Sequence, residues 1–330
     1  FGSITSFDGT EWTFDALPGA AVGNEIVHVG AGEWVVVGEA GSIWRLLPGG
    51  EWQLESGGSG DSLLAISGAP DDSLALVAGR SNTVMQRTDA GFVAAFGGST
   101  SSRFDVDVAS ASAAVVVGSS RSVLIWDGTS WTNRFETQFA NGAIIRGVWT
   151  RSATEYWMIG AGVVHRTDAG VDRYLDLGFT GSQQTIFGFS DTDVWAGGGA
   201  TLDAGSVSHF DGTSWTPTSG LCGRIYDLHG LAPDDLWAVG AEGCIARWDG
   251  AAWSEVDAGV SVALNAVWAA DRRNVYIGGE DGTLLRWDGT AFETLTTDTT
   301  GAVTGVWATS AENVWLSGSE GAWIRRSATP

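Results

Sequence analysis

A motif of about forty residues recurs from one end of the chain to the other, and it constrains the fold more than any other feature. Five copies of a turn-like tetrapeptide start with Asp-Gly, at residues 8, 127, 211, 249 and 288, and three weaker copies start at Pro48, Asp89 and Asp168. Consecutive turn starts are 38 to 43 residues apart. Repetition at this period indicates a repeat architecture, so residues 1–330 are predicted to form one domain.

Each turn start predicts a β-hairpin, because Asp and Gly tolerate the backbone angles that a two-residue hairpin turn requires. Two more short apolar segments precede each hairpin, most clearly at 264–268 and 274–278 before the hairpin strand at 283–287. With the strand after the turn, every repeat has four strands. No segment shows a helical period, and the 48 glycines would interrupt a helix. Four short strands per repeat predict an all-β propeller.

Two repeats depart from the common pattern around the turn. An aromatic residue follows the turn start by four positions in six repeats, at Trp12, Trp52, Trp131, Trp215, Trp253 and Phe292. In the repeats that start at Asp89 and Asp168, the aromatic residue comes at Phe92 and Tyr174 instead. We therefore expect a different hairpin in these two repeats.

The strand sets predict how many blades the propeller has and how it closes. Eight sets of first to third strands start near residues 25, 62, 104, 144, 184, 224, 264 and 303, so we predict a closed eight-bladed β-propeller with four-stranded blades. The last set has no fourth strand, and the segment 12–14 has no blade before it, so the two are expected to pair. Residues 3–7 also resemble a third strand. We expect residues 323–326 to take that position, because Arg325 matches other repeats, and residues 3–7 to lie outside 12–14 as a fifth strand.

The repeat unit Val-Trp-Ala…Asn-Val-Trp…Gly…Arg-Trp-Asp-Gly-Thr…Trp resembles the tandem propeller repeats of secreted or surface proteins from myxobacteria and related bacteria, most closely from Asp211 to Trp323. The resemblance implies the architecture and little chemistry. The turns are also distantly similar to those of Asp-box propellers, in which Asp and Gly lie two residues apart. Only the turns at Asp89 and Asp168 keep that spacing, and no sialidase activity is carried over.

The charge of the chain limits its partners. All 17 basic residues are arginines, 39 residues are acidic, and the net charge is −22. Such a surface repels phosphate backbones and anionic lipids and attracts basic partners. No apolar segment is long enough to span a bilayer, and residues 1–20 lack the features of a signal peptide. We expect a monomeric propeller with no nucleic-acid partner and no membrane insertion.

The turn aspartates have a structural and a functional interpretation. They could be calcium ligands, but one Asp per repeat distributes them over different blades, and a calcium site needs six or more converging oxygens. Capping of the turn by the Asp side chain explains them better. The four histidines have no metal-ligand spacing, so no metal site is predicted. The turn aspartates are Asp8, Asp89, Asp127, Asp168, Asp211, Asp249 and Asp288.

Tryptophan and arginine also recur at fixed places in the repeats. Periodic placement favours packing between blades for most of the 18 tryptophans, rather than sugar-stacking platforms. An arginine lies two residues before several turns, and a half-buried guanidinium there needs a carboxylate or an aromatic face. Arg247 is expected to pair with Asp249 or to stack on Trp253. The set is also the candidate for sugar binding if the protein is a lectin, and it comprises Arg87, Arg166, Arg247, Arg286 and Arg325.

The two cysteines, Cys222 and Cys244, both fall in the sixth repeat, at the same end of the predicted blade. A disulfide is predicted if a loop bends to bring them within reach, and buried thiols are the alternative. A disulfide favours an extracellular, cell-surface or periplasmic location.

The remaining candidate ligand-binding residues lie in the turns between second and third strands, where loops carry function more often than strands do. Four are acidic: Glu242, Glu280, Asp281 and Glu320. The fifth repeat alone lengthens this turn, over residues 199–205, which adds Thr201, Leu202 and Asp203.

No catalytic or nucleotide-binding motif occurs in the sequence, so neither an activity nor a cofactor is predicted. The leading hypothesis is a non-catalytic secreted or surface interaction scaffold that binds an unknown protein or glycan at the loop face. A carbohydrate-binding propeller is the first alternative. The second is a quinoprotein dehydrogenase, although this chain is much shorter and lacks adjacent cysteines.

Overall fold

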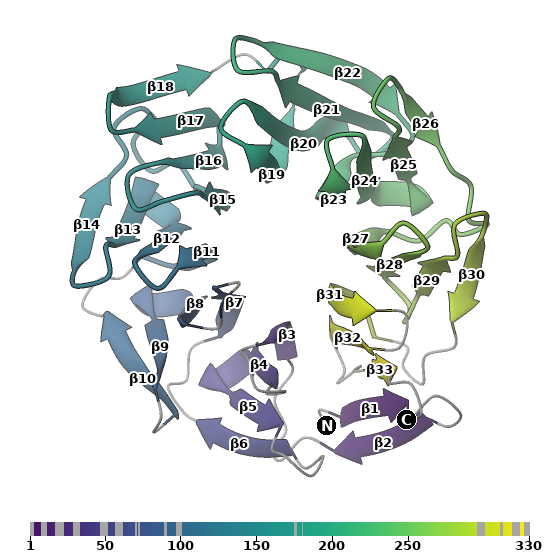
Figure 1. Ribbon diagram of the computed structural model, residues 1–330, viewed down its shortest axis with the longest axis horizontal. Coiled ribbons are helices and arrows are strands. Elements are labelled where there is room, and N and C mark those ends of the chain that lie inside the picture. The colour runs from purple at the N-terminus through teal and green to yellow at the C-terminus, as the bar shows by residue number, and fades with distance from the viewer. Residues whose placement is uncertain are drawn as a thin grey trace. The chain divides into compact units, whose positions relative to one another are not determined.

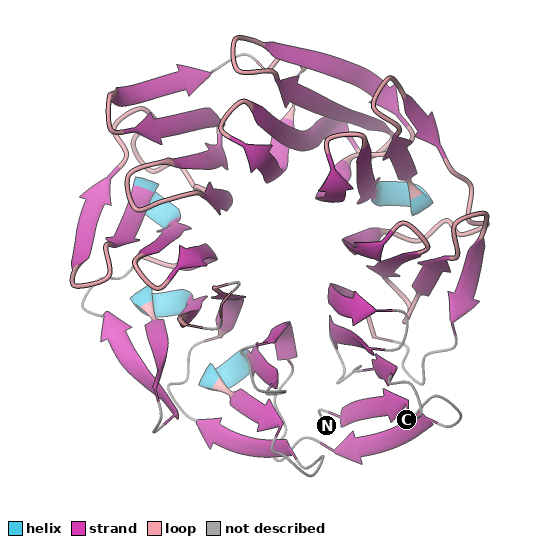
Figure 2. Ribbon diagram, viewed as in Figure 1, coloured by secondary structure: helices cyan, strands magenta, loops and turns pink. Residues whose placement is uncertain are grey.

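The computed structural model describes residues 3–7, 12–16, 23–28, 34–46, 52–56, 62–69, 71, 73–88, 91–96, 101–174, 177–179, 181–295, 301–310, 313–318 and 324–326. Regular structure in these residues consists of β-strands and short 3-10 turns (Figure 2). Contacts divide the chain into two compact units. We call residues 27–177 the central unit, and residues 1–26 with 178–330 the terminal unit.

The central unit contains four-stranded antiparallel sheets in which the strands follow chain order (Figure 1). The first sheet begins in β3, which spans the boundary between the units. The strands are β3 (Gly23–His28), β4 (Trp34–Gly38), β5 (Ile43–Leu46) and β6 (Trp52–Ser56); β7 (Leu63–Gly68), β8 (Ala75–Gly79), β9 (Val84–Thr88) and β10 (Gly91–Phe96); β11 (Arg103–Ser110), β12 (Ala113–Gly118), β13 (Ser122–Trp126) and β14 (Trp131–Phe135); and β15 (Gly147–Thr150), β16 (Tyr156–Gly160), β17 (Gly162–Thr167) and β18 (Gly170–Tyr174).

The terminal unit continues the same pattern in three more four-stranded sheets. Their strands are β19 (Ser182–Ser190), β20 (Asp193–Thr201), β21 (Ala204–Phe210) and β22 (Trp215–Leu221); β23 (Ile225–Ala232), β24 (Asp235–Gly240), β25 (Ile245–Trp248) and β26 (Trp253–Glu255); and β27 (Leu264–Asp271), β28 (Asn274–Gly279), β29 (Leu284–Trp287) and β30 (Phe292–Leu295). The unit also contains β1 (Ser3–Phe7), β2 (Trp12–Ala16), β31 (Val303–Ser310), β32 (Asn313–Gly318) and β33 (Ile324–Arg326).

The prediction of eight four-stranded blades is wrong. The described residues form seven four-stranded blades, and the strands from the two chain ends form a five-stranded sheet in the order β2-β1-β33-β32-β31. This sheet differs in kind, because β1 runs parallel to β33 whereas the paired strands of the blades are antiparallel. Counting repeats predicts the number of strand sets. It does not predict whether two chain ends combine into a blade of the common type.

The order of the strands at the chain ends also differs from the prediction. As expected, β33 takes the place next to β32. However, β1 rather than β2 lies beside β33, with Thr5 opposite Ile324, and β2 is the outermost strand. β1 and β2 form one hairpin, and it is the outer edge of β1 that meets β33. Similarity between repeats predicts that residues 323–326, rather than residues 3–7, form the third strand of this sheet. It does not predict which strand of the β1–β2 hairpin pairs with β33.

Neighbouring blades within a unit pack face to face. First strands contact first strands, β7 with β11 and β11 with β15 in the central unit, and β19 with β23 and β23 with β27 in the terminal unit. Second strands such as β12, β16, β24 and β28 are buried along their whole length, as expected for strands that are covered on both faces.

Recurring aromatic residues fill the space between the blades. Trp195 on β20 lies 5.3 Å from Trp248 and 5.8 Å from Trp253 of the next blade, ring centre to ring centre. Trp237 on β24 makes the same contacts with Trp287, at 5.5 Å, and with Phe292, at 5.8 Å. For these residues the interpretation of periodic tryptophan as packing is confirmed.

Side chains on β11 bond to the backbone of the next blade. Asp105 and Asp107 accept hydrogen bonds from the backbone N–H groups of Val148 (2.9 Å) and Thr150 (2.6 Å) on β15. A first strand is the edge of its sheet, so these N–H groups have no partner within their own blade. Burial raises the pKa of Asp107 to about 6.

The same arrangement recurs in the terminal unit with one change of residue type. Asp227 and His229 on β23 accept hydrogen bonds from the N–H groups of Val267 (2.9 Å) and Ala269 (3.1 Å) on β27. Burial raises the pKa of Asp227 to about 6 and lowers that of His229 to about 4. His229 is therefore neutral and serves as a hydrogen-bond acceptor for the next blade.

Turn aspartates cap their own turns. Oδ1 of Asp127 accepts hydrogen bonds from the N–H groups of Thr129 and Ser130, both at 2.8 Å. Asp211, Asp249 and Asp288 accept from the same two positions of their turns, and these bonds lower the pKa of all four carboxyl groups. The structural interpretation holds for these four. Asp8 and Asp89 lie outside the described residues.

Candidate functional site

The aromatic residue of the second strand often lies opposite an arginine or a histidine of the third strand. Arg247 lies opposite Trp237, with its guanidinium carbon 5.1 Å from the ring centre, and its Nη2 donates to Oδ1 of Asp235 at 3.1 Å. The prediction that Arg247 pairs with Asp249 or stacks on Trp253 is wrong. Strand pairing sets the guanidinium over Trp237, next to the acid that begins the second strand.

Equivalent pairs occur in three other blades that have an aromatic residue at the position of Trp237, namely Tyr276, Trp195 and Trp157. Arg286 lies opposite Tyr276, and its Nη2 donates to Oδ1 of Asn274 at 2.8 Å. His209 stacks on Trp195 with 3.9 Å between ring centres, and its Nε2 lies 2.8 Å from Oδ1 of Asp193. His165 stacks on Trp157 at 3.8 Å. Sequence reasoning missed both histidines, which alignment on the turn between second and third strands would have found.

Arg166 is not equivalent to Arg247, although both lie two residues before a turn aspartate. On β17, His165 is the residue opposite Trp157, and Arg166 lies opposite Tyr156. The third strand reaches its aspartate one residue later than in β25, since Asp168 lies three residues after His165 whereas Asp249 lies two residues after Arg247. Side chains alternate along a strand, so one residue moves the arginine to the other face.

The repeat at Asp89 shows the same shift. Gln86 lies opposite Leu76, and Arg87 comes one residue further along. In both repeats the last strand pair before the turn encloses two residues, with Thr88 opposite Gly91 and Thr167 opposite Gly170. The prediction of a different hairpin in these repeats is confirmed. Arg325 belongs to β33, and its side chain lies outside the described residues.

A buried carboxylate holds Arg166 in its position. Glu136 has an exposed fraction of 0%, and its Oε2 accepts a hydrogen bond from Nε of Arg166 at 2.6 Å. Oε1 accepts from the N–H of Gln138 at 3.0 Å. Glu136 begins the connection between β14 and β15, which Phe139 anchors in the core. Glu136 lies outside the repeated pattern, so the periodic signal does not reveal it.

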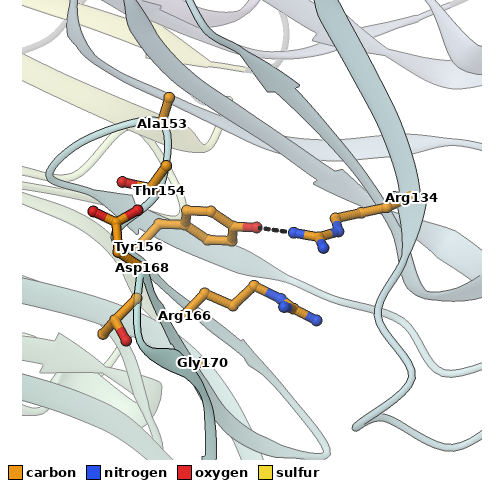
Figure 3. A pocket seen from close by; sticks show the side chains of 8 residues that line it. Arg134, Ala153, Thr154, Tyr156, Arg166, Asp168 and Gly170 are labelled. Carbon is orange, nitrogen blue, oxygen red and sulfur yellow. Dashed lines mark hydrogen bonds between the residues drawn. The ribbon is translucent and has the colours of Figure 1, made fainter.

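Arg166 lines a cleft of about 330 Å³ in the central unit (Figure 3). Nη1 of Arg134, on β14, donates to the hydroxyl oxygen of Tyr156, on β16, at 3.3 Å. Figure 3 shows the two guanidinium groups and this hydroxyl on one side, and Asp168 on the other. Burial raises the pKa of Tyr156, so its phenol is neutral. The lining residues are Arg134, Ala153, Thr154, Tyr156, Arg166, Thr167, Asp168 and Gly170.

The charge around the cleft differs from that of the whole chain. Residues 101–174 contain seven arginines and seven acidic residues, whereas the chain carries −22. Several of these acids are already engaged, Asp107 by the backbone of β15 and Glu136 by Arg166. No carboxylate among the described residues lies within ion-pair distance of Arg134. The region of the cleft is therefore balanced in charge rather than acidic, and its two guanidinium groups can donate hydrogen bonds to an anion.

The structure places the described acidic candidates on the turns of two blades, Glu242 between β24 and β25 and both Glu280 and Asp281 between β28 and β29. Glu242 and Asp281 are exposed on their turns, each with a left-handed backbone, at φ 57° and 55°. Glu280 accepts a hydrogen bond from Nδ2 of Asn265 at 3.1 Å. Glu320 lies outside the described residues. The acids that the structure describes do not converge on one site.

The lengthened segment of the fifth repeat is a longer hairpin rather than a loop. β20 extends to Thr201 and β21 starts at Ala204, so only Leu202 and Asp203 form the turn. Thr201 Oγ1 donates to Oδ1 of Asp203, and the carbonyl of Leu202 accepts from the N–H of Arg224 at 2.9 Å. Leu202 is 51% exposed.

Cys222 and Cys244 form a disulfide, the pair that the sequence predicts, with their Cα atoms 5.1 Å apart. Among the residues that the structure describes, no three His, Cys, Asp or Glu side chains gather as a metal site would require. The described part of the chain contains no helix that is long and apolar enough to cross a bilayer.

No protein-family model and no curated protein matches this chain. It is similar to solved structures that include YCF48 bound to a D1 peptide (14% identity, 98% of this chain and 97% of that chain, TM-score 0.63). Others are the WD40 β-propeller domain of Doa1 (12%, 93% and 93%, 0.59) and BamB from Moraxella catarrhalis (13%, 93% and 96%, 0.65). At these identities the likeness shows the β-propeller fold alone.

Proposed function

We propose that this chain is a non-catalytic scaffold that binds a protein partner, and that a segment of the partner enters the cleft between β14, β16 and β17. The observation that carries the proposal is the Glu136–Arg166 ion pair, which holds a binding group in place before any ligand arrives. Two cations and a neutral phenol form a set that binds rather than activates a nucleophile. Among the similar folds, YCF48 is bound to a peptide, which agrees with this use of a propeller.

A secreted or surface location is part of the same proposal. The Cys222–Cys244 disulfide supports it, because disulfides persist in oxidising compartments.

The carbohydrate-binding alternative has less support than it had from the sequence. The arginines that suggested it, Arg247 and Arg286, are engaged by Asp235 and Asn274 of their own blades. These two arginines are therefore not available to bind a sugar between blades.

A peptide selection tests the proposed function. Peptides would be selected from a phage-displayed library of random sequences on the purified chain, and their affinities measured by calorimetry. Thr154→Trp narrows the cleft from its exposed rim and should weaken the selected peptides at least about tenfold. Thr192→Trp is the matched control, because Thr192 occupies the same turn position, bonded to Ser190 as Thr154 is to Ser152. Equal affinity for wild type and Thr154→Trp would contradict the proposal.

A further inference from the structure

We propose that the cleft recognises a carboxylate of a peptide that is otherwise neutral or basic. This inference rests on the proposed function and names the group that the same site binds. It is drawn from the donors that remain unused at Arg134 and Arg166, from the charge that Glu136 neutralises, and from the charge of the chain.

Donors remain at both arginines. A guanidinium has five N–H donors, and the described residues engage one of Arg134, at Tyr156, and one of Arg166, at Glu136. The remaining N–H groups of Arg134 have no acceptor among the described residues. Tyr156 already accepts from Arg134, so its own O–H can donate. A planar carboxylate accepts two parallel bonds from a guanidinium, which suits this set.

The charge balance favours one negative charge over two. Glu136 neutralises Arg166, and Asp168 on the other side of the cleft offsets the charge of Arg134, so the four groups carry no net charge. Arg134 is the cation of the cleft that has no carboxylate of the described residues within ion-pair distance, so it can pair with one negative charge of a ligand. The field of a chain at −22 opposes every negative charge on a ligand. A carboxylate carries one charge and a phosphate monoester nearly two, so the carboxylate is preferred.

The same field explains why the rest of the ligand is neutral or basic. Positive groups outside the cleft are attracted to the acidic surface, and they speed association. A carboxylate can come from the C-terminus of a peptide or from an Asp or Glu side chain. The chemistry at the cleft is shared, and the two sources are separated by the probes.

The test uses acetylated hexapeptides of Gly, Lys and Ala, titrated into the wild-type chain while the Nε–H resonances of Arg134 and Arg166 are followed by NMR. One peptide ends in a free carboxylate, one is amidated, and one is amidated with an internal Glu. We expect the free or the Glu carboxylate to shift the Arg134 resonance with at least about fivefold higher affinity than the amidated peptide. Equal binding of the amidated peptide would overturn the inference.

Matched variants separate recognition from general charge. Arg134→Gln should weaken the carboxylate peptide about tenfold, whereas Arg146→Gln removes the same charge from an exposed residue outside the cleft and should change affinity less than twofold. Asp168→Asn should bind equally well or more tightly. Equal losses in the two arginine variants, or a loss in Asp168→Asn, would contradict carboxylate recognition.

Two further probes complete the design. Inorganic phosphate should compete more weakly than acetate, and tighter phosphate binding would overturn the preference for one charge. Glucuronate should not replace the peptides, and Arg134-dependent binding of glucuronate without peptide binding would assign the site to acidic glycans instead. If selected peptides depend on Thr154 but not on a carboxylate, this inference fails while the proposed function stands. If they depend on neither, both fail.

Discussion

β17 and β25 carry the same short pattern, an arginine two residues before an aspartate, and use it on opposite faces of the blade. Arg247 lies over Trp237 within its own blade, whereas Arg166 is bonded to Glu136 and lines a cleft. His165 takes the place over Trp157 that Arg166 leaves. A difference of one residue before the turn is sufficient, because strand side chains alternate. A repeat can thus present an arginine on the other face of the blade without a change of fold.

The largest effect is expected when each of the two arginines, Arg166 and Arg247, is replaced by methionine, which removes its contact with a carboxylate. Arg166→Met leaves Glu136 buried without a cation, at a cost of about 3–5 kcal/mol in the free energy of unfolding. Arg247→Met should cost only about 1–2 kcal/mol, because Arg272 remains 3.5 Å from Asp235. Urea denaturation compares the two.

The double variant Glu136→Met/Arg166→Met is the control for this comparison, and it should recover most of the stability that Arg166→Met loses. Equal losses at the two arginines, or no recovery in the double variant, would contradict the difference between the two regions.

The disulfide is a second difference, because Cys244 directly precedes β25 and β17 has no such link. Replacing both cysteines, as Cys222→Ser with Cys244→Ala, should lower the free energy of unfolding by about 3 kcal/mol, since the loop closed in the unfolded chain is lost. Denaturation with and without a reductant measures this. If the reductant lowers the stability of the double variant as much as that of wild type, the loss does not come from the disulfide.

A pH series extends the comparison to the first strands. Burial raises the folded-state pKa of Asp107 to about 6, so its contribution to stability is present below pH 4 and is lost as the pH rises through 6. Between pH 5 and 7.5, wild type should lose about 1 kcal/mol that Asp107→Asn does not lose. Denaturation at both pH values measures the difference.

The corresponding pair in the terminal unit should behave differently. The lowered pKa of His229 makes its contribution fall as the pH drops from about 6.5 through 4, which opposes the contribution of Asp227. Asp227→Asn should therefore unmask a fall in stability toward acid pH. Parallel pH curves for wild type and Asp107→Asn would show that Asp107 titrates normally.

The smallest effect is expected for a substitution that gives β17 the arginine over tryptophan that β25 has. His165→Arg places a guanidinium over Trp157, beside Glu155, as in β25, and should change the free energy of unfolding by less than about 1 kcal/mol. A thermal shift assay compares it with wild type. A large loss would mean that the faces of β17 are not arranged as in β25.

Periodicity predicts those parts of this molecule in which each blade repeats the one before it. Turn starts and aromatic spacing predict the hairpin at Asp249 and the packing of Trp237, because the same contacts recur at each interface. They do not predict the face of Arg166, since that depends on the register of the preceding strand pair. Glu136 lies in a connection between blades that is outside the repeated pattern. The role of Arg134 depends on its contact with Tyr156, which the spacing of residues does not indicate. The chain ends depart as well, because the β1–β2 hairpin joins β33 through a parallel strand pair that occurs in none of the described four-stranded blades.

A crystal structure of the chain with a peptide that ends in a free carboxylate measures the register of β17 and the use of the cleft together. We expect Nε of Arg166 within hydrogen-bond distance of Glu136, His165 on the face of Trp157, and the peptide carboxylate bonded to Arg134. A structure in which Arg166 stacks on Trp157, or in which the peptide binds elsewhere and leaves Arg134 bonded only to Tyr156, would contradict this arrangement.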